Sequence, residues 1–124
     1  MSKFVRVQTE LRDVTLVKRA LDELELRYRE DAVYTHRWTG HEEGVRFLVD
    51  APAPTFGLRA GDDGVLELVG DDMGMRKLRQ TLGRIQQRYA YHTVLAAVNE
   101  AGFDLVDERA GDDQVIRLTV RRWS

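Results

Sequence analysis

Residues 75–102, MRKLRQTLGRIQQRYAYHTVLAAVNEAG, carry the longest helical pattern in the sequence. Apolar side chains recur there every three or four residues, which predicts one long helix with a buried stripe. Gly102 follows the last residue of the pattern, at the position where a glycine commonly ends a helix. The stripe consists of Leu78, Leu82, Ile85 and Tyr89, continued by His92 and Ala96.

A second apolar stripe begins inside this segment, at RYAYHTVL (residues 88–95), and lies about 120° around the helix from the first. Its members are Tyr91, Val94, Leu95 and Val98. Two interpretations stay open: a single helix buried on two sides, or a helix that breaks near residues 88–90. In both we expect Tyr91 to be largely buried and His92 to face the packed side, each with a hydrogen-bond partner.

Towards the N-terminus the pattern changes to the alternation of β-strands. Residues 4–11 alternate as a half-buried strand does, and Asp13 can cap the helix that follows. The apolar positions of that helix are Val14, Val17, Leu21 and Leu24. Four short alternating segments come next, separated by turns rich in Gly, Pro or Asp, and they predict an antiparallel meander. These segments are residues 32–38, 45–49, 56–58 and 65–69.

Two further strands close the chain, at residues 103–108 and 115–123, with AGDDQ (residues 110–114) as their hairpin loop. The order is therefore β-α-β-β-β-β-α-β-β. We predict the α+β class, with one twisted antiparallel sheet and both helices packed on one face. The length suits a single domain over residues 1–124.

The composition excludes several kinds of chemistry. The sequence has no cysteine, and its serines are at positions 2 and 124. Disulfides, thiolate nucleophiles and a serine nucleophile elbow are therefore not expected. The glycines lack the spacing of a dinucleotide or Walker loop, so we expect no nucleotide cofactor. No window approaches the ~20 apolar residues of a membrane span, which favours a cytoplasmic protein without a membrane partner.

The triplet Gly-Asp-Asp occurs at residues 61–63, 70–72 and 111–113. Paired carboxylates could hold a hard divalent cation, but the ligand spacing of a calcium loop is missing. Each triplet lies between predicted strands or before a helix, where Gly and Asp are ordinary turn residues. Asp71 or Asp72 could also cap the long helix.

The histidines are weak candidates for a metal site. His36 and His41 lie in THRWTGHEEG (residues 35–44), and His92 is the third histidine that a zinc-like site would need. The spacing matches no HExxH motif. A polar loop at the end of a strand is the alternative interpretation.

The basic run on the long helix is the main candidate surface. It contains Arg76, Lys77, Arg79, Arg84 and Arg88, followed by Tyr89 and Tyr91, with no acidic residue between residues 73 and 98. Cations with aromatic side chains can follow phosphates and stack on bases. The same run can be the solvated side of a helix or a patch that meets an acidic protein. The net charge of −2 offers no global basic field for nucleic acid.

Two segments give the sequence a family likeness. QQRYAYHTVLAAVNEAGFDLVDE (residues 86–108) and DDQVIRLTVRRW (residues 112–123) resemble the C-terminal signature of the uncharacterised family of hypothetical chloroplast reading frame thirty-five, known from plastids, cyanobacteria and other bacteria. The start, residues 1–24, is similar to that family's opening strand and helix. Lys3 and the segment GDDMGM (residues 70–75) depart from the family pattern. The resemblance implies a small cytosolic or stromal protein and assigns no catalytic residue.

These observations favour a non-enzymatic interaction or adaptor module that presents its basic helix to a protein partner. The predicted surface is Arg76, Lys77, Arg79, Arg84, Arg88 and Tyr89. Nucleic-acid binding through the same helix is the alternative, and a metal-dependent enzyme using His36, His41 and His92 is a weaker one. Self-association through exposed strand edges is a further prediction.

Overall fold

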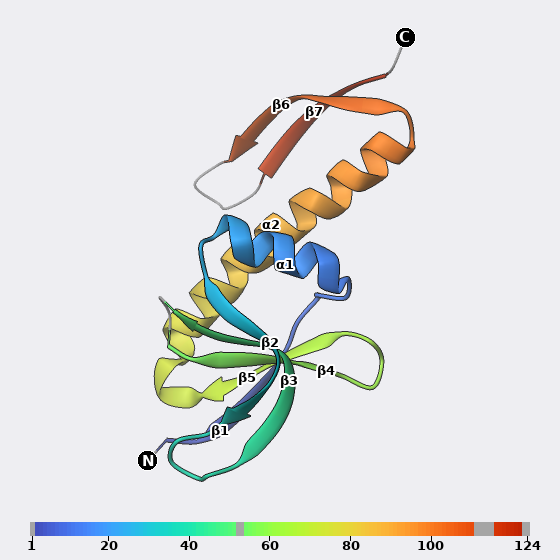
Figure 1. The fold of residues 1–124 in the computed structure, drawn as a ribbon. Helices are drawn as coiled ribbons and strands as arrows, with labels where there is room; N and C mark the ends of the chain where they lie inside the picture. The colour runs from blue at the N-terminus through green and yellow to red at the C-terminus, as the bar shows by residue number, and fades with distance from the viewer. Residues whose placement is uncertain (1, 52–53, 111–115, 123–124) are drawn as a thin grey trace.

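The computed structural model describes residues 2–51, 54–110 and 116–122. Its elements in chain order are β1 (Phe4–Gln8), α1 (Val14–Glu23), β2 (Arg27–Thr35), β3 (Glu42–Ala51), β4 (Phe56–Ala60), β5 (Leu66–Asp71), the 3-10 helix η1 (Asp72–Gly74), α2 (Met75–Glu100), β6 (Phe103–Ala110) and β7 (Ile116–Arg122). The α+β class and the predicted order of elements are confirmed (Figure 1). Most of the predicted loop at residues 110–114 lies outside the described residues.

Five strands form one antiparallel sheet in the order β1-β5-β4-β3-β2. The predicted meander is confirmed, because each strand from β2 to β5 pairs with the next one in the chain. The first strand adds to the meander on its β5 side, where Val7 lies opposite Leu68. β1 and β2 are consequently the two edges of the sheet.

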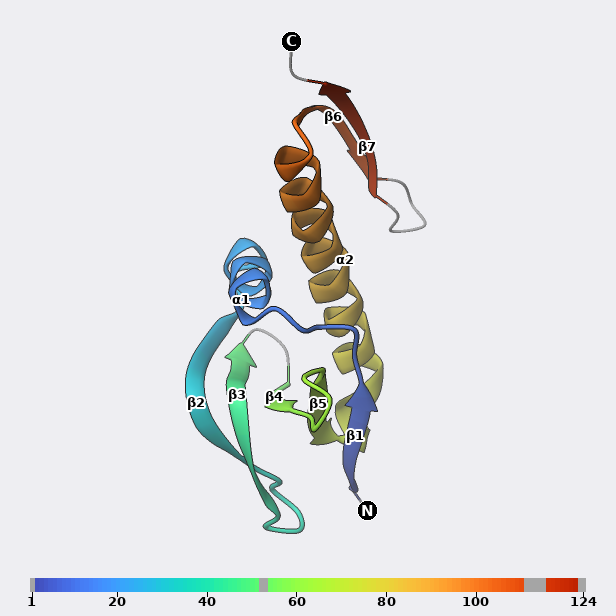
Figure 2. The same ribbon diagram turned by 90° about the vertical axis from the view of Figure 1, so that its right-hand side faces the viewer.

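The last two strands depart from the prediction of a single sheet. β6 and β7 pair only with each other and form a separate two-stranded sheet. The reason is the length of α2, whose 26 residues carry the chain about 39 Å at 1.5 Å per residue. The helix extends past the five-stranded sheet, and the β6–β7 hairpin folds back on its far end (Figures 1 and 2).

Both helices pack on one face of the five-stranded sheet, as predicted. Asp13 caps α1, since its carboxylate accepts hydrogen bonds from the backbone N–H groups of Thr15 and Leu16. The fully or almost fully buried core side chains include Val17 and Leu21 of α1, Leu78 and Ile85 of α2, and Phe47, Phe56, Leu58 and Leu68 of the sheet. Burial of these side chains is the main stabilising contribution to the fold.

α2 runs unbroken from Met75 to Glu100, so the interpretation with a break near residues 88–90 is wrong. The first stripe enters the core as far as Tyr89 and His92 is buried as predicted, but Ala96, which continues the predicted stripe, is exposed. The β6–β7 hairpin contacts α2, and Glu108 of β6 lies 3.2 Å from Arg88, just before the second stripe begins. The burial of that stripe is partial: Tyr91, predicted to be largely buried, is half-buried, and Val94 is 45% exposed.

A smaller apolar cluster lies on the opposite face of the sheet. The β2–β3 hairpin curls over that face and brings Tyr34 and Val45 against Val69, with Phe4 at the border. Two irregularities let the hairpin bend: Asp31 in the middle of β2 has a positive φ of 50°, and the register of β2 against β3 shifts between Arg27 and Tyr28. A glycine is required at position 57, because a Cβ there would come within 2.5 Å of Val45 Cγ1.

Candidate functional site

The predicted basic surface separates into two parts on α2. Arg76, Lys77, Arg79 and Arg84 are exposed on the first three turns of the helix. Within the described part of the chain, no carboxylate lies in ion-pair contact with any of the four. Their charges are therefore left to solvent or to a partner.

Arg88 and Tyr89, the other two predicted surface residues, are engaged inside the molecule. The Arg88 guanidinium lies 2.8 Å from Glu23 of α1 and 3.2 Å from Glu108 of β6, and it covers the Tyr91 ring at 4.3 Å. Burial acts to lower the pKa of Arg88, and its hydrogen bonds to Glu108 and Glu23 reverse that effect and raise the pKa. Arg88 thus joins α1, α2 and β6.

The Tyr89 side chain fixes the entry to α1. Its hydroxyl accepts hydrogen bonds from the backbone N–H groups of Arg12, at 3.1 Å, and Asp13, at 3.0 Å. Its ring packs against the main core. A phenol held in this way is not positioned to stack on a base, so the exposed surface consists of the four cations nearer the N-terminus of α2.

His36 closes the tip of the β2–β3 hairpin against β5. Its ring is completely buried, and its Nδ1 accepts hydrogen bonds from the hydroxyl and backbone N–H of Thr39. The proton therefore lies on Nε2, which donates to Asp71 Oδ1 at 2.8 Å. The imidazole holds the hairpin tip to β5 and stabilises the curl of the sheet.

Asp71 and Asp72 do not cap α2, contrary to the prediction. Asp71 binds His36, and Asp72 accepts the backbone N–H of Lys3 at 2.8 Å. α2 starts from Gly74, which provides no side-chain cap. Long-range partners for both carboxylates outweigh the local cap.

The first Gly-Asp-Asp triplet forms a turn as predicted. Asp63 accepts the backbone N–H of Val65 at 3.1 Å, and Gly64 has a φ of 81° that suits glycine. The second triplet ends β5 and enters η1. The third, at residues 111–113, lies outside the described residues.

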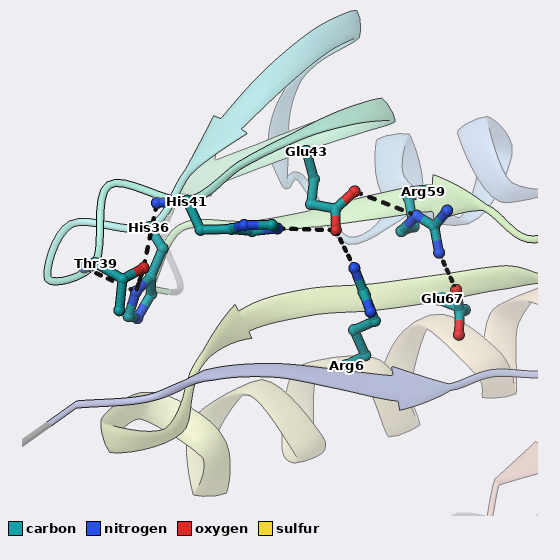
Figure 3. Close-up of polar contacts among 7 residues, drawn as sticks. All are labelled: Arg6, His36, Thr39, His41, Glu43, Arg59 and Glu67. Atoms are coloured by element: carbon teal, nitrogen blue, oxygen red, sulfur yellow. Dashed lines mark hydrogen bonds and ion pairs between the residues drawn. The ribbon is translucent and has the colours of Figure 1, made fainter.

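Glu43 is the centre of an ionic network on the curled face of the sheet (Figure 3). Its carboxylate binds Arg6 of β1, lies 3.0 Å from His41 Nε2 and 3.6 Å from Arg59 of β4. Arg59 also binds Glu67 of β5. The hydrogen bonds from His41 and Arg6 lower the pKa of Glu43, which stays ionised and joins three strands.

This network borders an open groove of about 500 Å³ along β3. Its walls carry cations and carboxylates that already neutralise one another: Arg46 lies 3.5 Å from Asp31, and Arg59 contacts Glu43 and Glu67. The sequence did not predict this arrangement. The polar positions were visible in the alternation, but their partners depend on strand register.

The three histidines do not converge on one site. His36 binds Asp71, His41 binds Glu43, and His92 Nε2 binds Glu23 of α1. Burial lowers the pKa of His92, with Arg19 and Arg88 acting in the same direction against Glu23 and Glu108. Among the residues that the structure describes, no three histidine or carboxylate side chains are grouped to hold a metal ion. The helices in the described ranges include none long and apolar enough to cross a membrane.

Comparison with known proteins gives a consistent result. A family model described as "Protein of unknown function (DUF1257)" matches residues 20–119. The chain is 28% identical to the uncharacterized protein ycf35 of Guillardia theta, over 99% of this chain and 98% of the relative. It is 25% identical to the ycf35 proteins of Pyropia yezoensis and Cyanophora paradoxa, again over nearly the full length of both chains. The resemblance seen in the sequence is thereby confirmed. No solved structure matches the chain.

Proposed function

We propose a function for this chain, which belongs to the DUF1257 family of proteins of unknown function: it is a non-enzymatic interaction module that binds an acidic segment of a protein partner through α2. The binding surface consists of Arg76, Lys77, Arg79 and Arg84, called here the basic face. We place this binding in the cytoplasm, as the sequence predicts.

The observation that carries the proposal is that four cations without a carboxylate partner in the described part of the chain lie together at the start of α2. Six cations are held by carboxylates of this chain: Arg6, Lys18, Arg27, Arg46, Arg59 and Arg88. The basic face places four cations on three helical turns without such partners among the described residues. Like charges at this spacing repel one another, so a carboxylate-rich partner gains complementary contacts at each of them.

A protein partner is favoured over nucleic acid by the two tyrosines near the basic face. Stacking platforms for single strands need accessible aromatic rings. Tyr89 is held by the α1 entry, and the Tyr91 ring lies under Arg88. The chain's net charge of −2 also opposes general attraction to a polyanion.

Co-purification from cells that express the full chain tests this proposal. We compare the wild type with the double substitution Arg76→Glu and Arg84→Glu. The matched control is Arg29→Glu with Arg37→Glu, which changes the net charge equally at exposed positions on β2 and the turn after it. We expect one stoichiometric protein, with an acidic contact segment, to stay with the wild type and the control. The Arg76 and Arg84 variant should bind it at least about tenfold more weakly.

Mass measurement and nuclease treatment identify what is lost from the variant. Retention of the same protein by all three chains would contradict the proposal. Loss of bound nucleic acid, with no change in bound protein, would assign the basic face to the alternative function.

A further inference from the structure

A groove lies at the start of α2, at one end of the basic face. It has a volume of about 340 Å³ and is lined by Pro54, Met73, Gly74, Arg76, Lys77 and Gln80. Pro54 packs close over the backbone of Gly74, where an added Cβ would stand 3.3 Å from the proline Cβ. The volume is at the lower end of the range for ligand sites, which suits one or two side chains.

The groove joins an apolar wall to a cationic one. Met73 is 76% exposed, and with Pro54 it presents an unbranched thioether chain and a pyrrolidine ring to the solvent. Methionine adapts its shape to different apolar groups and is common at surfaces that bind peptides. On the other wall are Arg76 and Lys77, two members of the basic face.

The helix start adds to the positive character of this end. α2 has no acidic residue in its first turn, and no side chain caps Gly74. The nearest carboxylates, Asp71 and Asp72, precede α2 and bind His36 and the backbone N–H of Lys3, so neither caps the positive end of the helix dipole. A ligand that places a large apolar group in the groove therefore binds most tightly when negative charges flank that group.

We infer that the groove holds one large apolar side chain of a short acidic peptide segment, with the flanking carboxylates of that segment on Arg76 and Lys77. The inference rests on the proposed function and names the partner's chemistry more closely. An acidic surface of a folded protein would use the four cations without filling the groove. The occupant is therefore a linear segment in which a Phe, Leu or Met stands among Asp and Glu.

Two labelled peptides test this inference. Both are seven residues long and have six acidic residues; one has a central phenylalanine and its twin a central alanine. Fluorescence anisotropy with the wild-type chain should give about tenfold tighter binding for the phenylalanine peptide, the factor expected from burying one large apolar side chain. Met73→Ser should remove this difference and leave the alanine peptide's affinity unchanged.

Both substituted positions are exposed, so we expect the Met73→Ser and Val94→Ser variants to fold. Met73 lies outside the core, and Val94→Ser, at another exposed apolar position of the same polypeptide, is the control that should keep the full difference. Equal binding of the two peptides by the wild type would overturn the inference, as would a phenylalanine preference that survives Met73→Ser. If both peptides bind equally and Arg84→Glu weakens both, the basic face stands and the groove has no part in it. Tighter binding of an oligothymidylate than of either peptide would overturn both proposals.

Discussion

The two halves of α2 contain similar residues and serve the molecule differently. In the first half, one stripe enters the core and the opposite side keeps its cations exposed. In the second half, α1 and the β6–β7 hairpin contact the helix, and the cation Arg88 lies between Glu23 and Glu108. The role of an arginine on this helix is thus set by the acidic residues that the tertiary structure places opposite it.

The largest expected effect is the difference in stability lost when a packed side chain is truncated in each half of α2. Ile85→Ala removes a completely buried side chain from the first half and should reduce the free energy of unfolding by about 2–5 kcal/mol. Val94→Ala removes a side chain that is 45% exposed in the second half and should cost less than about 1 kcal/mol. Urea denaturation followed by circular dichroism measures both. Similar losses at the two positions would show that the second half is packed as tightly as the first.

A smaller effect should separate the cations. Arg88→Met loses two half-buried ion pairs and the contact with the Tyr91 ring, and we expect a loss of about 1–3 kcal/mol in unfolding free energy. Arg84→Met is the matched control, because Arg84 has no ion pair with a described residue, and its stability should be unchanged. Urea denaturation measures both variants. Equal losses of unfolding free energy for Arg88→Met and Arg84→Met would contradict the different roles of the two arginines.

The smallest effect concerns pH and His92. Its pKa is lowered in the folded chain, so between that pKa and the unfolded value near 6.5 the unfolded chain binds more protons. Stability should therefore fall as the pH falls below about 6.5. His92→Gln removes this contribution, and the variant should lose less stability than the wild type between pH 7.5 and pH 5. A steeper loss in the variant would show that protonation of His92 stabilises its contact with Glu23.

Local patterns predicted much of this fold from the sequence. The Asp13 cap, the meander and both stripes of α2 follow from residues that are neighbours along the chain. The separate β6–β7 sheet was not predicted, because alternation identifies strands and says nothing of which strands pair. The α2 length, taken with its rise per residue, was the available signal.

The candidate site was only partly predicted for the same reason. The basic run was visible in the sequence. That Arg88 is bound inside the molecule, unlike the four exposed cations, depends on Glu23 of α1 and Glu108 of β6. Asp71 had the local features of a helix cap, yet it binds His36, 35 residues earlier in the chain. Each of these errors concerns a long-range contact.

The most direct test of the basic face is zero-length cross-linking of the chain to its co-purified partner. A carbodiimide couples a lysine amine to a carboxylate only where the two are in contact, and the chain has three lysines, Lys3, Lys18 and Lys77. Lys18 lies 3.2 Å from Glu30 and supplies an internal standard. Our account predicts that the partner is coupled through Lys77, at an Asp or Glu of an acidic segment. A partner coupled through Lys3 instead, while the Lys18–Glu30 standard forms, would contradict it.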